Sequence, residues 1–130
     1  MFKKFSLLAI FLSLFTTVAL ANSAKDISQQ ALQKIMSADN KGKVVLLDVR
    51  TPQEYAAGHV PGAINISHTE IKANLAKLLP HKNDTVIVYC RSGHRAGIAA
   101  EILANNGFTK LQHLSGDMNG WYEAKLPIEK

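Results

Sequence analysis

A six-residue segment of the sequence has the residue types for nucleophilic chemistry. It reads Cys90-Arg91-Ser92-Gly93-His94-Arg95 and contains the only cysteine of the chain. Positive charge and the free N–H groups at a helix start both stabilise a thiolate, the reactive form of cysteine. Gly93 permits a tight turn in which several backbone N–H groups point inward around an anion or a sulfur atom. The segment therefore predicts a reactive cysteine in an anion-binding loop, whereas most lone cysteines are inert and buried.

Two predicted elements hold this loop in place. The run Thr85–Tyr89 is rich in β-branched residues and predicts a central, buried strand that ends just before Cys90. From Ala96 the pattern predicts a helix that turns Ile98, Ile102 and Leu103 inward and ends at Gly107.

The rest of the chain alternates between predicted strands and helices. Further strands are expected at 44–47, 63–66 and 111–114, and helices at 28–36, at 52–57, and from Ser67 or Thr69 to Leu79, with a turn between Gly116 and Gly120. Such alternation predicts an α/β fold with a central parallel sheet flanked by helices. Ligands bind outside the carboxyl ends of the strands in such sheets, where Asp48, Arg50 and Cys90 fall.

Residues 1–21 are typical of a secretory signal peptide. Lys3 and Lys4 precede an apolar run, Leu7–Leu20, and small residues at Ala19 and Ala21 fit a cleavage site after Ala21. The stretch is only marginally long for a membrane-spanning helix, the alternative interpretation, so no stable membrane anchor is expected. The predicted location is the periplasm.

Removal of this segment leaves residues 22–130, enough for one domain with a single core. Taking Lys3 and Lys4 from the 15 basic residues leaves 13 against 10 acidic ones, a net charge of +3. The basic residues are scattered and no aromatic residues interleave with them, which argues against a nucleic-acid surface and favours small anionic ligands.

Three segments resemble the single-domain rhodaneses, a family of sulfurtransferases. They are Asp48-Val49-Arg50 with Glu54-Tyr55, then Gly58-His59-Val60-Pro61-Gly62-Ala63-Ile64-Asn65, and the loop Cys90–Arg95. The resemblance extends from about Asp26 to Leu126 and implies a three-layer rhodanese-like domain.

The resemblance also implies an activity. Cys90 would be the catalytic nucleophile, taking sulfur from thiosulfate or a similar donor as a persulfide and passing it to a thiol, cyanide or protein acceptor. Arg91, Ser92, Gly93, His94 and Arg95 would bind the substrate, their N–H groups stabilising the persulfide and the two arginines attracting the anionic donor. No metal or organic cofactor is implied.

Two other functions stay open. The chain could be a rhodanese-like module that carries sulfur or binds a partner without rapid turnover. Phosphatase or arsenate reductase activity is the third hypothesis, because the related dual-specificity phosphatases share the fold. Their loop has five residues between cysteine and arginine, whereas four separate Cys90 from Arg95, and the smaller pocket favours sulfur.

One departure from the family lies near the carboxyl end. Many members carry paired glycines before a tryptophan, and Ser115-Gly116 precedes Trp121 here, so Ser115 is expected to take the place of the first glycine. This leaves the shape of the substrate mouth open.

Several polar residues are expected to have structural roles. Asp48 and Arg50 should tie a strand end to neighbouring loops, His59 should fix a turn, and Trp121 should cover the core. The five histidines lack the spacing of a zinc site, and only His94 lies where it could modulate the thiol.

Overall fold

A five-stranded parallel sheet forms the centre of the protein. The computed structural model describes residues 24–39 and 43–130, so the predicted signal peptide, residues 1–21, lies outside the described residues. The strands are β1 (Lys25–Ile27), β2 (Val44–Asp48), β3 (Ile64–Asn65), β4 (Thr85–Tyr89) and β5 (Leu111–Leu114). Their order is β1-β5-β4-β2-β3, and every pair is parallel. The run predicted as central is therefore the middle strand, β4.

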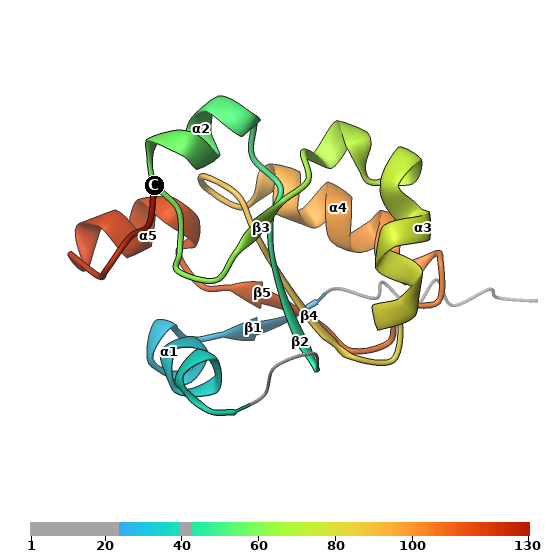
Figure 1. Ribbon diagram of the computed structural model, residues 1–130, viewed down its shortest axis with the longest axis horizontal. Coiled ribbons are helices and arrows are strands. Elements are labelled where there is room, and N and C mark those ends of the chain that lie inside the picture. The colour runs from blue at the N-terminus through green and yellow to red at the C-terminus, as the bar shows by residue number, and fades with distance from the viewer. Residues whose placement is uncertain (1–23, 40–42) are drawn as a thin grey trace, which may run out of the picture.

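Helices cover both faces of this sheet, which confirms the three-layer α/β prediction (Figure 1). One face carries α3 (Leu75–Leu78) and α4 (His94–Ala104), and the other carries α1 (Gln29–Ser37) and α5 (Asp117–Glu123). Successive side chains of a strand point to opposite faces. Val86 and Val88 accordingly enter the core beneath α4, whereas Ile87 and Tyr89 enter the core beneath α1 and α5.

The prediction of one continuous helix up to Leu79 was wrong. The segment contains 3₁₀ turns at His68–Glu70, Lys72–Asn74 and Leu79–His81, and α3 spans only four residues. The Ser67 hydroxyl donates to the Arg50 carbonyl at 3.0 Å instead of capping a helix. The Asn74 side chain donates to the Glu70 carbonyl at 2.8 Å, and such local bonds compete with regular helix formation.

Three further details differ from the sequence-based expectations. Ile98 is exposed, because α4 turns a face of small residues, Ala96, Ala99 and Ala100, together with Leu103 toward the sheet. The predicted turn between Gly116 and Gly120 lies mostly within α5. Strand β1 was missed, since three residues are too few to display an alternating pattern.

Helix α2 (Pro52–Ala57) lies at the carboxyl edge of the sheet, and α4 holds it there. Thr51 Oγ1 accepts the Glu54 N–H, and the Glu54 carboxylate accepts the Thr51 N–H, which makes a capping box. The same carboxylate accepts two hydrogen bonds from the Arg95 guanidinium, at 2.6 and 3.0 Å. These Arg95 bonds, followed by the Thr51 contacts, lower the pKa of Glu54 to about 2.

No helix within residues 24–39 and 43–130 is long and apolar enough to cross a membrane.

Glu54→Gln is expected to lower the free energy of unfolding at pH 7 by about 1 kcal/mol, because the charged half of a partly exposed bidentate pair is lost. Folding lowers the pKa of Glu54, so the ionised carboxylate stabilises the folded state. This contribution is present above pH 4.5 and is lost as the pH falls toward 2. Urea unfolding over that pH range should therefore show the variant converging on the wild type.

Glu70→Gln is a matched control that removes one exposed carboxylate outside this pair. It should change the unfolding free energy by less than about 0.5 kcal/mol at any of these pH values. A constant deficit of Glu54→Gln from pH 7 down to pH 2 would contradict the role given to the ion pair.

Candidate active site

Cys90 follows β4 directly and is buried, with 1% of its surface exposed. The Gly93 N–H donates to Cys90 Sγ at 3.0 Å, and Gly93 is also the cap residue at the start of α4. Gly93 has φ 116°, which side chains rarely adopt, and a Cβ there would lie 3.2 Å from Asp117 Oδ2. The glycine thus suits both the backbone turn and the narrow space beside the Asp117 carboxylate.

The structure orients the remaining loop residues differently from one another. Arg91, Ser92 and His94 are exposed, whereas the Arg95 side chain is only 23% exposed and is held by Glu54. Hydrogen bonding to Glu54 raises the pKa of Arg95, and the charges of Glu54 and of the nearby Cys90 raise it further. Of the loop N–H groups predicted to surround the sulfur, that of Gly93 makes the contact seen here.

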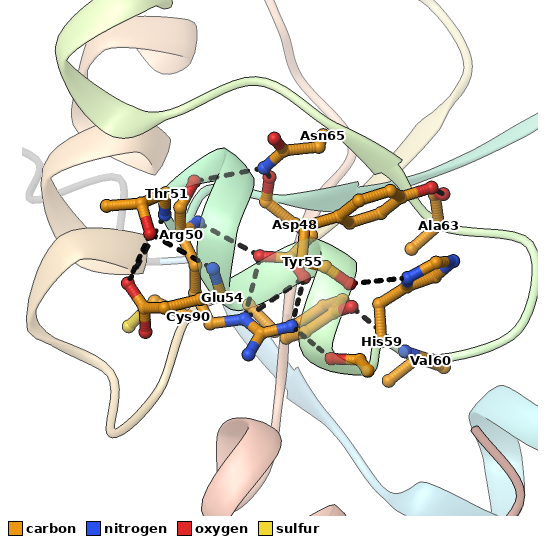
Figure 2. Close-up of polar contacts among 12 residues, drawn as sticks. Asp48, Arg50, Thr51, Glu54, Tyr55, His59, Val60, Ala63, Asn65 and Cys90 are labelled. Atoms are coloured by element: carbon orange, nitrogen blue, oxygen red, sulfur yellow. Dashed lines mark hydrogen bonds and ion pairs between the residues drawn. The ribbon is translucent and has the colours of Figure 1, made fainter. Parts of the chain in front are cut away.

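Asp48 and Arg50 form a buried pair at the end of β2, as Figure 2 shows. Arg50 Nη2 lies 2.6 Å from Asp48 Oδ2 and donates a second bond to the Gly58 carbonyl at 2.8 Å. The Asn65 side chain donates to the carbonyls of Asp48 and Arg50, at 3.0 and 2.9 Å. These bonds tie the strand end to the next loop, which is the structural role predicted for Asp48 and Arg50.

His59 and Trp121 also have the expected structural roles. The His59 ring stacks on Tyr55 at 3.6 Å between centroids, and Nδ1 donates to the Tyr55 carbonyl at 2.9 Å. His59 exchanges two backbone hydrogen bonds with Glu129, so it anchors the end of the chain. Trp121 is buried in the core beneath α1 and α5.

Sequence reasoning missed a chain of three side chains that reaches the cysteine. The Cys90 N–H donates to Asp117 Oδ1 at 3.0 Å. His113 Nε2 lies 2.9 and 3.0 Å from the two Asp117 oxygens, and its Nδ1 lies 3.1 Å from Asp26 Oδ1. The bond to Asp117, with Asp26 contributing less, raises the pKa of His113. No sequence spacing signals this arrangement, because Asp117 is 27 residues from Cys90.

From the sequence, Ser115 is expected to replace one of two paired glycines, whereas the backbone indicates that Asp117 does so. Gly116 has φ 81° and Asp117 has φ 52°, so these two residues form the left-handed pair that paired glycines would suit. Asp117, rather than Ser115, is the residue that stands where a glycine is easiest to accommodate. The Ser115 N–H continues the sheet by donating to the Ile27 carbonyl at 2.9 Å.

Backbone bonds join α5 to the loop Cys90–Arg95. The Met118 N–H donates to the Cys90 carbonyl at 2.9 Å, and the Asn119 N–H donates to the Arg91 carbonyl at 3.1 Å. The first turn of α5 therefore fixes the start of the loop. Within residues 24–39 and 43–130, no group of three His, Cys, Asp or Glu residues could hold a metal ion.

Comparison with known proteins places this geometry in one family. The rhodanese-like domain family matches residues 28–124. The thiosulfate sulfurtransferase PspE of Escherichia coli is 47% identical over 70 residues, which cover 54% of this chain and 67% of that protein. A sulfurtransferase of Allochromatium vinosum is 34% identical over 85 residues, covering 65% of this chain and 78% of that one.

A putative sulfur carrier protein of Bacillus subtilis, YrkF, is 31% identical over 101 residues, covering 78% of this chain and 52% of that protein. Among solved structures, a rhodanese-related protein from Thermoplasma volcanium aligns with a TM-score of 0.67 at 26% identity, covering 81% of this chain and 97% of that one. The fold, the position of the cysteine loop and these matches lead to the same conclusion: the chain belongs to the rhodanese-like domain family.

Proposed function

We propose that this protein is a sulfurtransferase that moves a sulfane sulfur from thiosulfate or a similar anionic donor to a thiophilic acceptor through a persulfide on Cys90. The observation that carries the proposal is Cys90 Sγ at the carboxyl end of the central strand, with the Gly93 N–H aimed at it from 3.0 Å. The family and its sulfurtransferase and sulfur-carrier relatives support a role in sulfur transfer or carriage.

The reaction has two displacement steps. The Cys90 thiolate forms a bond to the outer sulfur of thiosulfate, the S–S bond of thiosulfate breaks, and sulfite leaves with the electron pair. The acceptor then attacks the terminal sulfur of the persulfide, and Cys90 leaves again as a thiolate. The Gly93 N–H and the amino end of α4 stabilise the negative charge in both steps.

Charge at the loop favours an anionic donor. Arg95 is paired with Glu54, so its field is partly cancelled. Arg91 is exposed and makes no ion pair with any residue that the structure describes. We therefore assign the main attraction of the donor to Arg91, and the positioning of the loop against α2 to Arg95.

Cys90→Ser is expected to abolish sulfur transfer, because a hydroxyl forms no persulfide. Incubation of the wild type with thiosulfate should add one sulfur atom to the intact protein by mass spectrometry. Cyanide should then remove it and release thiocyanate. The serine variant should show neither event and should retain the circular dichroism spectrum of the wild type.

The outcomes of this experiment separate the alternatives. A wild type that gains no sulfur and forms no thiocyanate would refute the proposal. A persulfide that forms but transfers only when a partner protein is present would favour the sulfur-carrier function. Hydrolysis of an aryl phosphate in place of sulfur transfer would favour a phosphatase.

Arg91→Gln is expected to raise KM for thiosulfate about threefold to tenfold at low ionic strength with little change in kcat, because it removes a charge that attracts the donor. The effect should shrink as salt is added, since exposed charges are screened. Lys110→Gln removes one positive charge next to the amino end of β5 and should leave KM within about twofold. Equal effects of the two variants would refute the assignment to Arg91.

We also propose that residues 1–21 direct export and are removed, on the basis of their charge and apolar pattern. Amino-terminal sequencing of the protein from the periplasmic fraction should begin at Asn22. Recovery of a chain that keeps Met1 in the cytoplasmic fraction would contradict this proposal.

A further inference from the structure

His113 is placed so that both ring nitrogens face carboxylates. Its Nε2 faces Asp117 on α5 and its Nδ1 faces Asp26 on β1. An ionised carboxylate only accepts hydrogen bonds, so a ring that bonds to both must carry a proton on each nitrogen. Val88 pairs with His113 on β4, and a Cβ at Gly93 would lie 3.8 Å from the ring. The geometry therefore selects the imidazolium, in agreement with the raised pKa of His113.

The two carboxylates that contact His113 differ in their surroundings. The Asp26 side chain is 73% exposed, whereas that of Asp117 is 3% exposed. Water screens the contact between His113 and Asp26, so the contact between His113 and Asp117 is the stronger interaction. A buried carboxylate is costly unless a charge and hydrogen bonds accompany it, and His113 and the Cys90 N–H supply both to Asp117.

The Asp117 carboxylate also lies close to the reactive sulfur. Its Oδ1 is 3.0 Å from the Cys90 nitrogen. Sγ is three bonds from that nitrogen, so the carboxylate is within about 7 Å of the sulfur, less than a Debye length. An uncompensated negative charge at that distance would disfavour a thiolate or a persulfide anion.

Asp117 has a left-handed backbone conformation that is unfavourable for a residue with a side chain. This indicates that its carboxylate is retained for the contacts with Cys90 and His113. A residue with a Cβ in the left-handed region costs about 1 to 2 kcal/mol relative to its usual conformation, and glycine would avoid that cost. The carboxylate bonds to Cys90 and His113 offset it.

We propose that His113 is a positioning residue for sulfur transfer: its imidazolium neutralises Asp117, so that this carboxylate can hold the Cys90 backbone without opposing negative charge on the sulfur. The catalytic meaning of this inference rests on the proposed function, whereas the effect on the thiolate does not.

Cys90 is the only cysteine of the chain, so its alkylation by iodoacetamide reports on one thiolate without any sulfur donor. His113→Gln keeps a hydrogen-bond donor for Asp117 but removes the charge, and it should slow alkylation at pH 7 and low salt about threefold to tenfold. Asp117→Asn removes the opposing charge and should react within about twofold of the wild type. The double variant should recover to the same range, because position 117 then carries no charge that needs to be neutralised.

This rescue separates an electrostatic role from a merely structural one. A double variant as slow as His113→Gln, or a His113→Gln rate equal to that of the wild type, would overturn the inference. Asp117→Asn keeps an oxygen that accepts the Cys90 N–H, and the circular dichroism spectrum of each variant shows whether a slow rate reflects lost charge or lost fold. If the alkylation pattern holds but the wild type forms no persulfide, the inference stands and the proposed function fails.

Discussion

The end of β4 is the constraint on which the site depends. The ladder of the sheet stops there: the Tyr89 carbonyl still accepts the Val49 N–H at 3.0 Å, but Cys90 is buried beyond the last paired residue. Buried backbone groups need partners. The Asp117 carboxylate and the Met118 N–H supply them from the first turn of α5, so α5 takes over from the sheet where the sheet ends.

A second set of contacts holds the other side of the loop. Glu54 joins α2 to the first turn of α4, and Asp48 with Arg50 fixes the connection that leads into α2. The Glu54–Arg95 pair links segments that follow two different strands, β2 and β4, whereas Asp48 and Arg50 both lie at the end of β2. The loop Cys90–Arg95 is thus held between α2 and α5, and Gly93 turns the backbone within it at a φ of 116°.

Much of this arrangement could be predicted from the sequence. Short sequence patterns were enough to place the loop at the carboxyl end of the sheet. They are the β-branched run of β4, Pro52 at the start of α2, and the residues that follow Cys90. The prediction that Ile98 faces the core was wrong because a helical pattern is read from large apolar residues, whereas α4 packs on the sheet mainly through alanines. The side-chain contacts that His113 makes with Asp26 and Asp117 could not be predicted. They depend on the parallel pairing of β1 with β5, which brings Asp26 and His113, 87 positions apart, into contact.

If Cys90 carries a persulfide as proposed, its burial would set the order in which an incoming molecule meets the two sulfur atoms. Cys90 is almost inaccessible, with 1% of its surface exposed, whereas a second sulfur bonded to Sγ would extend beyond it by one S–S bond, about 2 Å. An acceptor would therefore encounter the transferable atom before the one that stays with the protein. Sterics alone would then steer a bulky thiol toward taking the sulfur and away from becoming trapped as a mixed disulfide.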